Sequence, residues 1–299
     1  MVGRAVPGPP GRMDLPETGV RRVRRHFIPS LTRVFMRHAA LLLAAALTTA
    51  PVGAQTDDGT TFRWSGNVAE GHFIRLHNMN GDVRVERSAP GSNVEVVGER
   101  TVRGGDGRIV RFDVRMRDDG DVVVCALWGA DMTCTDEGSR GRYQSNWRGG
   151  DRVSVALRVR VPDGVKAYAR STNGGILVEG ISAEVDAATT NGDVRVRTTS
   201  GVVNATTTNG SITATLGSSD GDAPMRFTTT NGTVTVYAPP TLSANLEMST
   251  TNGELAVDFP VTVSGQLGRK QIRGRLGQGG RSIVVRSTNG DVSLRSKGI

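Results

Sequence analysis

The sequence predicts an all-β protein built largely as a β-solenoid that resembles a right-handed β-helix. Three observations favour this fold class. An Asn-Gly pair recurs seven times, and apolar residues alternate with other residues on both sides of each pair. Alternation with a period of two is typical of strands that bury one face, and a unit that returns at a near-regular spacing is typical of stacked repeats. No segment after residue 54 carries a convincing helical period.

The first part of the chain reads as a targeting signal. A short basic stretch, an apolar run and small residues ending at Ala54 follow one another over residues 36–54, as in a secretory signal peptide that is cleaved before Gln55. The apolar run is shorter than the roughly 20 residues that a membrane span needs. We interpret residues 1–35 as a disordered extension or the product of a start codon assigned too early. We therefore expect an exported chain that is periplasmic, cell-surface or secreted, without a transmembrane segment.

Removal of this signal changes the charge balance. The whole chain holds 37 Lys and Arg against 29 Asp and Glu, a net charge of +8. Residues 1–54 contribute eight Arg and two acidic residues, so the remainder has 29 basic and 27 acidic residues, a net of +2. A large basic excess is the footprint of a nucleic-acid-binding protein. Because most of the excess lies in the signal, we expect no nucleic acid as partner.

Residues 55–164 predict an irregular run of strands separated by turns rich in Gly and Asp. The region contains the only two cysteines of the chain, Cys125 and Cys134. In an exported protein such a pair most simply forms a disulfide. A zinc site would need further Cys or His ligands, and we expect neither a metal nor a cofactor. The predicted strands are Phe73–Leu76, Val83–Glu86, Val94–Val97, Ile109–Met116, Val122–Leu127 and Val153–Val161.

A long polar loop lies between Trp128 and Arg152 and carries three aromatic residues, Trp128, Tyr143 and Trp147. Long loops are often functional, and exposed aromatic rings on a stapled loop can stack on sugars or anchor a partner. These three residues are our candidate ligand contacts. The alternative is that the rings cap an open end of the solenoid or pack against the disulfide.

The repeat region covers residues 165–299 and continues from the preceding strands. Counted from each Asn, the positions six and four before it, and three and five after it, are apolar in all seven copies, 28 positions in total. The apolar parity changes at Asn-Gly, so the chain turns a corner there while keeping one set of side chains inward. Asn and Gly adopt positive φ at low cost. The turn-forming residues are Asn173 and Gly174, Asn191 and Gly192, Asn209 and Gly210, Asn231 and Gly232, Asn252 and Gly253, and Asn289 and Gly290, with a related pair at Asn80 and Gly81.

Two folds satisfy this pattern. Each Asn-Gly could be the turn of a two-residue hairpin, which would make an antiparallel β-meander or sandwich. Each could instead be the corner of a coil, with coils stacked in parallel as a solenoid. A step of 18 residues, as between Asn173 and Asn191, fits one coil of two short strands and two turns. We favour the solenoid.

These features together resemble an exported bacterial β-strand-repeat family of unknown function, labelled putative adhesin and related to the head GIN domain. The resemblance rests on the signal, the recurrent Thr-Asn-Gly units, the cysteine pair and the sequence from Val161 to Val165 that leads into the repeats, and it covers roughly residues 73–294. It implies a β-solenoid in an exterior location. The family offers no catalytic residue to carry over.

Little in the sequence predicts catalysis. The chain lacks the motifs of serine hydrolases, zinc peptidases and nucleotide-binding proteins, and His72 and His77 are predicted at a solvated edge. The acidic residues Asp82, Asp193, Glu254 and Asp291 follow Asn-Gly pairs, but they alternate with Ser, Thr and Gly, so we expect no clear acidic pair on adjacent coils of the kind that a glycosidase needs. The calcium-binding β-roll motif is also absent. The repeated threonines are expected to stack structurally between coils.

We therefore expect an exported, non-enzymatic β-repeat protein that acts as an adhesin-like binding or scaffolding module. A surface glycan or another envelope protein is the expected partner class. The alternative function is that of a carbohydrate-active β-helix enzyme, a polysaccharide lyase or a glycosidase.

Overall fold

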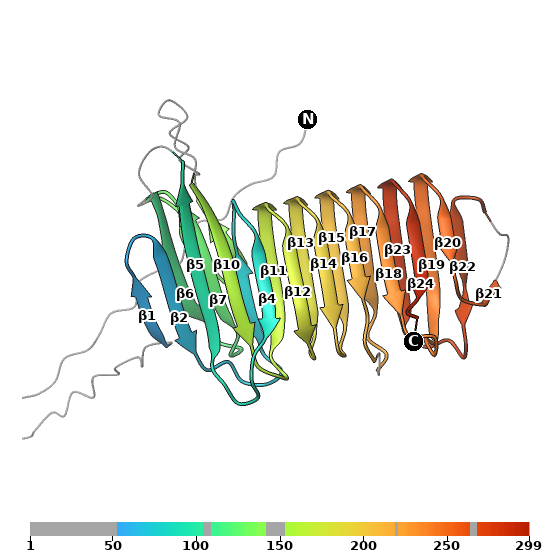
Figure 1. Ribbon diagram of the computed structural model, residues 1–299, viewed down its shortest axis with the longest axis horizontal. Coiled ribbons are helices and arrows are strands. Elements are labelled where there is room, and N and C mark those ends of the chain that lie inside the picture. Colours follow the sequence, from blue (N-terminus) through green and yellow to red (C-terminus); the bar gives the residue numbers. More distant parts are fainter. Residues whose placement is uncertain (1–52, 104–108, 142–152, 219–220, 264–267, 299) are drawn as a thin grey trace, which may run out of the picture. The chain divides into compact units, whose positions relative to one another are not determined.

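The computed structural model describes residues 53–103, 109–141, 153–218, 221–263 and 268–298 (Figure 1). These residues form two sheets of eleven strands each and one small two-stranded hairpin, and none of them belongs to an α-helix. The two large sheets stack face to face along the unit, and their inward side chains form one core. The all-β prediction is confirmed.

Sheet A contains the strands that follow the Asn-Gly corners, together with four strands from the N-terminal region. Its spatial order is β1 (Ala54–Asp57), β2 (Thr61–Gly66), β5 (Val94–Val102), β10 (Val153–Val161), β4 (Val83–Arg87), β12 (Ile176–Ile181), β14 (Val194–Thr198), β16 (Ile212–Thr215), β18 (Val234–Ala238), β24 (Val292–Ser296) and β20 (Leu255–Val257).

Sheet B contains the strands that precede the corners. Its spatial order is β21 (Val261–Val263), β22 (Gln271–Leu276), β19 (Ala244–Asn252), β23 (Ser282–Asn289), β17 (Met225–Asn231), β15 (Val203–Asn209), β13 (Val185–Asn191), β11 (Lys166–Asn173), β3 (Phe73–His77), β7 (Val122–Trp128) and β6 (Val110–Met116). The separate hairpin consists of β8 (Thr133–Thr135) and β9 (Gly138–Arg140).

Each Asn-Gly pair carries the chain from sheet B to sheet A, so the two strands around a corner never pair with each other. Strands of successive coils pair in parallel instead, as β13 does with β15, where Val185 lies opposite Val203. A meander would require antiparallel pairing across each corner. The solenoid prediction is therefore confirmed, and the meander alternative is wrong.

The inward positions assigned from the repeat form the core. Of the 28 predicted positions, 26 are buried, and the exceptions are Leu255 and Val257. The two exceptions are only partly buried and lie in β20, the last strand of sheet A. Burial of most inward Val, Ile, Leu, Met and Phe side chains contributes about 1.5 to 3 kcal/mol each, which holds the two sheets together.

The spatial order of the coils departs from the order in the sequence at two places. The first coil (β3 and β4) lies within the region predicted as irregular. The later strands β5 and β10 extend sheet A beyond β4, and β7 and β6 extend sheet B beyond β3. The coil formed by β23 and β24 inserts between β17–β18 and β19–β20. The boundary at residue 165 between the irregular region and the repeat region therefore falls between neighbouring strands of the same sheets, β4 and β12 in sheet A and β3 and β11 in sheet B.

The predicted extension and most of the predicted signal, residues 1–52, lie outside the described residues. Within the described ranges, no helix has the length and apolar character needed to cross a membrane.

Candidate functional site

The Asn side chains of the corners form one continuous ladder along the stack. Each Nδ2 donates a hydrogen bond of 2.8 Å to Oδ1 of the Asn in the adjacent coil, and six such bonds join seven residues. In spatial order the ladder runs Asn80, Asn173, Asn191, Asn209, Asn231, Asn289 and Asn252. The ladder uses one donor and one acceptor of each interior Asn, so these amides serve the fold.

The glycine beside each Asn is required by close approach of the backbones. A Cβ added to Gly210 would lie 2.0 Å from the carbonyl oxygen of Gly192, and the other corner glycines show distances of 2.1 to 2.3 Å to a backbone oxygen of the neighbouring strand. Gly210 also has φ of +157°. Any side chain at this position would force the two coils apart.

A hydroxyl two residues before each Asn joins the same corner to its neighbour. The Thr207 Oγ1 donates to the carbonyl oxygen of Gly192 at 2.9 Å, and Ser171, Thr189, Thr229, Thr250 and Ser287 make the equivalent bond. All six side chains are buried. In the first coil Asn78 replaces the hydroxyl residue, and its longer amide reaches the carbonyl oxygens of Gly81 and Val155 at 2.9 Å. This inward set of the repeated Thr residues is structural.

The carboxylates after the corners have structural partners as well. Oδ1 of Asp82 accepts the N–H of Gly175 at 2.7 Å, Asp193 accepts that of Ser211 at 2.9 Å, and Asp291 accepts that of Glu254 at 2.9 Å. Because β24 lies beside β20, Asp291 and Glu254 occupy adjacent coils. The prediction that no adjacent coils present an acidic pair is therefore wrong, because Glu254 and Asp291 follow consecutive Asn-Gly pairs in the sequence and lie on neighbouring strands in the structure. The described residues contain no group of three or more His, Cys, Asp or Glu that fits a metal ion.

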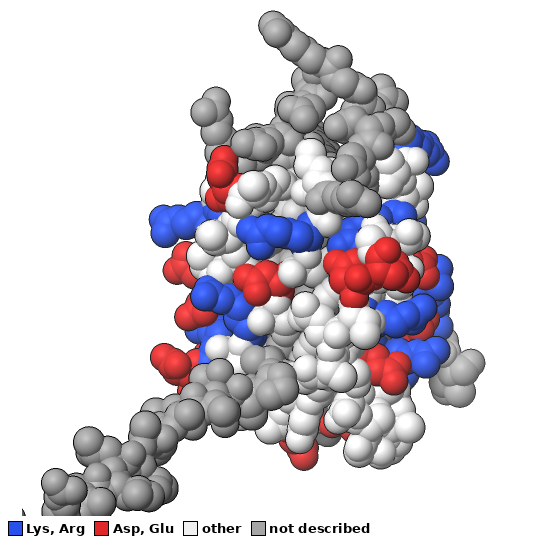
Figure 2. Space-filling view, turned by 90° about the vertical axis from the view of Figure 1, so that its left-hand side faces the viewer, with Lys and Arg blue, Asp and Glu red and all other residues white. Residues whose placement is uncertain are grey.

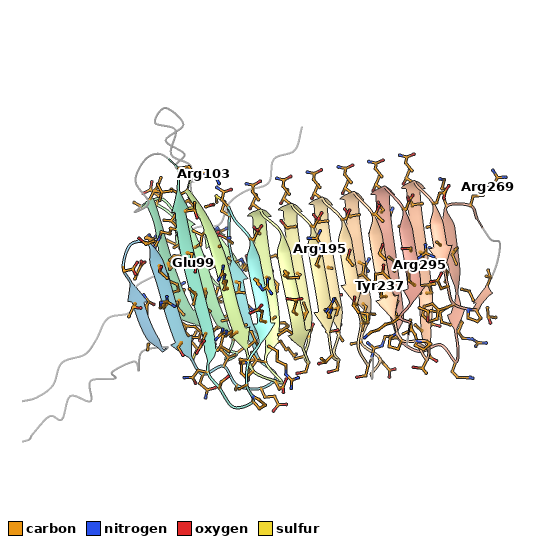
Figure 3. All side chains as sticks on the ribbon, viewed as in Figure 1. Glu99, Arg103, Arg195, Tyr237, Arg269 and Arg295 are labelled. Carbon is orange, nitrogen blue, oxygen red and sulfur yellow. A yellow bond between two sulfur atoms is a disulfide. The ribbon has the colours of Figure 1, made fainter. Side chains whose placement is uncertain are left out.

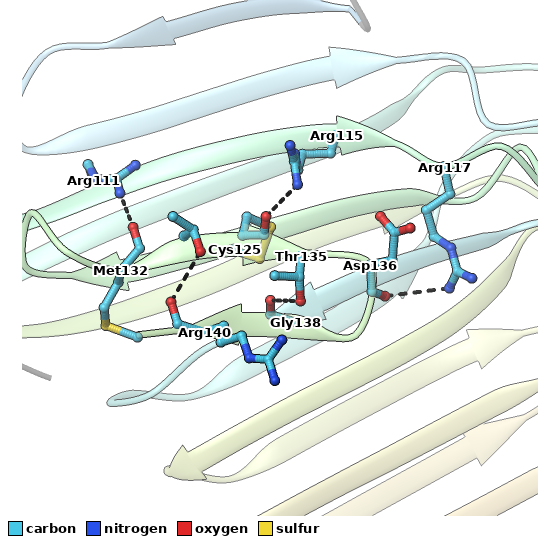
Figure 4. Close-up of a disulfide and its surroundings, with 11 residues drawn as sticks. Arg111, Arg115, Arg117, Cys125, Met132, Thr135, Asp136, Gly138 and Arg140 are labelled. Carbon is cyan, nitrogen blue, oxygen red and sulfur yellow. Dashed lines mark hydrogen bonds between the residues drawn. A yellow bond between two sulfur atoms is a disulfide. The ribbon is translucent and has the colours of Figure 1, made fainter. Parts of the chain in front are cut away.

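The predicted Cys125–Cys134 pair is a disulfide in the structure and fixes the small hairpin onto sheet B (Figure 4). Cys125 points outward from β7, and its Cα lies 5.7 Å from that of Cys134 in β8. Arg115 Nη1 donates to the carbonyl oxygen of Cys134 at 2.6 Å, and Arg111 donates to that of Met132. The hairpin covers the outer face of β7, which is why every residue of that strand is buried.

The three candidate aromatic contacts have different positions. Trp128 belongs to β7 and is 2% exposed, with its ring in the core, so in this structure it offers no surface to a ligand. Its indole Nε1 has no hydrogen-bond partner among the described residues. The ring lies on the face of β7 opposite Cys125, so it packs in the core and not on the disulfide, and this position differs from the predicted ligand contact. Tyr143 and Trp147 lie outside the described residues.

Beside the hairpin, sheet B presents a cluster of aromatic and charged side chains that was not predicted from the sequence. The guanidinium carbons of Arg75 and Arg170 lie 4.7 and 3.8 Å from the ring centre of Tyr168. Arg75 is bound to the buried Asp121 at 2.6 Å, and Arg170 to Asp186 at 3.0 Å. The sequence does indicate this contact, because Arg75 and Tyr168 each lie five residues before the Asn of their corner. In a stack of coils these two positions lie side by side on adjacent strands.

His77 also belongs to this cluster, and its predicted solvated position is wrong. The side chain lies below Gly138 of the hairpin and is buried, with a ring-centre distance of 5.6 Å to Tyr168. Burial, followed by the positive charges of Arg170 and Arg75, lowers the pKa of His77 to about 4. The imidazole is therefore neutral near pH 7. His72 has 38% of its side chain exposed, which is closer to the solvated position predicted for both histidines.

The outer face of sheet A offers the most exposed described aromatic ring. Tyr237 in β18 is 38% exposed, and its register neighbours are Thr215 in β16 and Arg295 in β24. Figure 3 labels Tyr237 and Arg295 on this face, with Arg195 two strands away in β14. Arg295 is bound to Asp258 at 2.9 Å. A ring between a hydroxyl and a guanidinium can stack on a sugar and donate to its oxygens.

Comparison with known proteins identifies a domain in the second half of the chain. Residues 151–295 match the Toastrack DUF4097 family model, which describes a domain of unknown function. The chain carries a Toastrack domain. The match begins just before β10 and extends through all the later coils, and it confirms the resemblance that the repeat units indicate.

Two solved structures are similar to the chain that carries this Toastrack domain. One is a putative cell adhesion protein from Clostridium sporogenes, with 10% identity, a TM-score of 0.46, and coverage of 82% of this chain and 100% of that chain. The other is a putative adhesin from Bacteroides fragilis, with 9% identity, a TM-score of 0.29, and coverage of 79% and 97%. Neither likeness is close enough to assign a function. No curated protein sequence matches the chain.

Proposed function

We propose that the chain is an exported, non-enzymatic protein whose Toastrack stack serves as a rigid, adhesin-like binding or scaffolding module at the cell surface or in the periplasm. The observation that carries this proposal is the use of the corner carboxylates. Asp82, Asp193 and Asp291 each hold a backbone N–H of the next coil, as structural ladder residues do. A glycoside hydrolase instead needs two carboxyl groups placed on either side of a substrate bond.

The outer face of sheet A is the proposed contact surface, and a glycan is the proposed ligand class. Tyr237 supplies an exposed ring, and Thr215 and Arg295 supply polar groups on the adjacent strands. The parallel ladder fixes the positions of all three, so little conformational entropy is lost on binding. Tyr143 and Trp147 remain proposed contacts in the loop, with a surface glycan or an envelope protein as partner.

The proposal is tested by incubating the purified chain with a panel of bacterial polysaccharides and measuring both binding and the release of new chain ends. We expect saturable binding without turnover. Tyr237→Ala should lower the affinity at least tenfold, while the matched variant Tyr168→Ala, on the opposite sheet, should bind normally. Loss of binding with Trp147→Ala alone would assign the contact to the loop.

The alternative, a carbohydrate-active enzyme, is favoured by one observation. Asp291 and Glu254 are exposed and lie in adjacent coils, so they form a carboxylate pair that the sequence analysis did not predict. Turnover of any polysaccharide that disappears in Asp291→Asn would establish this function and overturn the proposed one.

A further inference from the structure

We propose that copies of this chain join head to tail, with the C-terminal end of one two-sheet stack docking onto the N-terminal end of the next. Such a joint uses the ends of the stack, goes beyond the proposed ligand-binding function and does not depend on it. The observations that carry it are the stagger of the two sheets, the composition of their edge strands and the apolar side chains left exposed at both ends.

The two sheets are equal in strand number but offset by two strands. Each coil contributes one strand to each sheet, which gives seven facing pairs from β3–β4 to β19–β20. Beyond these pairs, sheet A has four further strands at the N-terminal end, where sheet B has two. Sheet B has two further strands, β22 and β21, at the C-terminal end, where sheet A has none. Figure 1 shows β1 and β2 at one end and β22 and β21 at the other.

This offset makes the two ends complementary. In the docked pair, the projecting strands β22 and β21 of one copy lie face to face with the projecting strands β1 and β2 of the next copy. The edge of β20 then meets the edge of β1 in sheet A, and the edge of β21 meets that of β6 in sheet B. Both new pairings are antiparallel when the strand directions are followed through each sheet. Each sheet would continue without interruption from copy to copy.

The edge strands at the C-terminal end are short and apolar. The strand β20 reads Leu-Ala-Val and β21 reads Val-Thr-Val, and neither contains a charged residue, a proline or a bulge, although both have only three residues and Glu254, Asp258 and Pro260 flank them. The inward residues Leu255, Val257, Val261, Val263 and Ile272 are only partly buried, although the equivalent positions in the interior coils are fully buried. Their remaining apolar surface faces the space that a further pair of strands would fill.

The N-terminal end exposes an apolar side chain in the same way. Met116 in β6, the outermost strand of sheet B at this end, is 54% exposed and is the most exposed large apolar side chain in the described part of the chain. Met116 lies on the inward face of sheet B, since its partner Val122 pairs in turn with the buried Ile74. Figure 2, which looks onto this end, shows an uncharged band between flanks of mixed charge.

The charges at this end are compatible with such a joint. Asp57 of β1 is bound to the buried Arg100 of β5 at 2.6 Å, and Arg100 also lies over the ring of Phe112. Docking would therefore bury a charge pair that is already formed, rather than an unpaired charge. A joint between two different surfaces of the same chain does not close on itself, so it leads to linear assemblies rather than to a symmetric dimer.

The experiment measures the assembly of the full chain by sedimentation velocity over a wide range of concentration. We expect species larger than a dimer that grow with concentration. Met116→Lys places a charge on the N-terminal end and Val263→Lys places one on the C-terminal end. Each variant alone should be monomeric, because each has one blocked end. An equimolar mixture should give a dimer and nothing larger, since one competent end of each kind remains.

The control is Thr206→Lys, an exposed position in the middle of sheet B, which should assemble like the unaltered chain. Thermal unfolding of every variant tests whether it is folded. If Val263→Lys does not fold, Ala256→Lys is used instead to place a charge on the C-terminal end. A monomeric unaltered chain at the highest soluble concentration would overturn the proposal. Dimers formed by Met116→Lys alone would also overturn it, because they would show that two like ends join.

Discussion

The side-chain amide of Asn252 donates a 2.8 Å hydrogen bond to Oδ1 of Asn289, which follows it by 37 residues in the chain. Asn289 in turn donates to Asn231 at 2.8 Å. The later coil therefore lies between two earlier ones, with its inward residues Ile283, Val285, Val292 and Leu294 fully buried. Repeat units with the same corner and the same inward pattern can exchange places in a stack without loss of any ladder contact.

The corner glycines should tolerate no side chain. Gly210→Ala would bring Cβ to 2.0 Å from a backbone oxygen, so we expect the free energy of unfolding to fall by about 3 kcal/mol or more. Gly91→Ala is the matched control, because Gly91 also has positive φ but a Cβ there meets nothing within 4 Å. It should cost about 1 kcal/mol. Equal losses in urea unfolding would show that φ, and not the close approach, requires glycine.

The Asn ladder should contribute measurably although its side chains are exposed. Asn209→Ala removes the hydrogen bond donated to Asn191 and the one accepted from Asn231. Each such bond contributes about 0.5 to 1.5 kcal/mol net, so the free energy of unfolding should fall by about 1 to 3 kcal/mol. Thr208→Ala, at the exposed neighbouring position, should cost less than about 0.5 kcal/mol. Chemical denaturation compares the two, and an unchanged midpoint for Asn209→Ala would contradict a stabilising ladder.

His77 should make stability depend on pH in the acidic range. Its pKa is about 4 in the folded chain and 6.5 when unperturbed, so between these values the unfolded chain binds the proton more readily. The stabilising contribution is complete above pH 6.5 and is lost as the pH falls towards 4, with a total of about 3 kcal/mol. His77→Phe should flatten the stability profile in this window, because it removes the buried imidazole. Parallel profiles for the unaltered chain and His77→Phe would refute the assignment.

Removal of the disulfide should release the hairpin and spare the stack. In the double variant Cys125→Ala and Cys134→Ala we expect the amides of residues 133–140 to exchange hydrogen much faster, and stability to fall by about 2 to 3 kcal/mol. The amides of β13 and β15 should keep their protection, because those strands have no contact with the hairpin in the sheet order. Two free thiols titrated in the native, unaltered chain would contradict the pairing.

Much of the fold was predictable because each repeat carries two signals in the sequence, the Asn-Gly corner and the alternation of apolar residues on both sides of it. The parity change at each Asn-Gly corner identifies the inward residues on both sides, and 26 of the 28 are buried. The order of the coils was not predictable, since Asn231, Asn289 and Asn252 have equivalent surroundings and nothing local ranks them. The outer position of residues 88–161 also depends on pairing between distant strands, which a short sequence window does not show.

The candidate site was predictable only in part. The disulfide follows from the two cysteines, but the inward position of Trp128 follows from its parity in β7 relative to Cys125, which points the other way. Tyr168 and Arg75 were not predicted as a pair because outward positions vary between copies and show no common pattern. Alignment of the outward positions coil by coil puts these two residues at the same place on adjacent strands, which is sufficient to predict their contact.

The insertion of the coil formed by residues 282–296 has a consequence for how the protein is made. The ribosome releases residues 244–257 first, at a time when the coil that will separate them from residues 225–238 does not yet exist. If the two earlier coils stacked directly on each other, that arrangement would have to open by one strand in each sheet, about 4.8 Å, before the late coil could enter. Completion of this half of the stack therefore depends on the coil that is synthesised last.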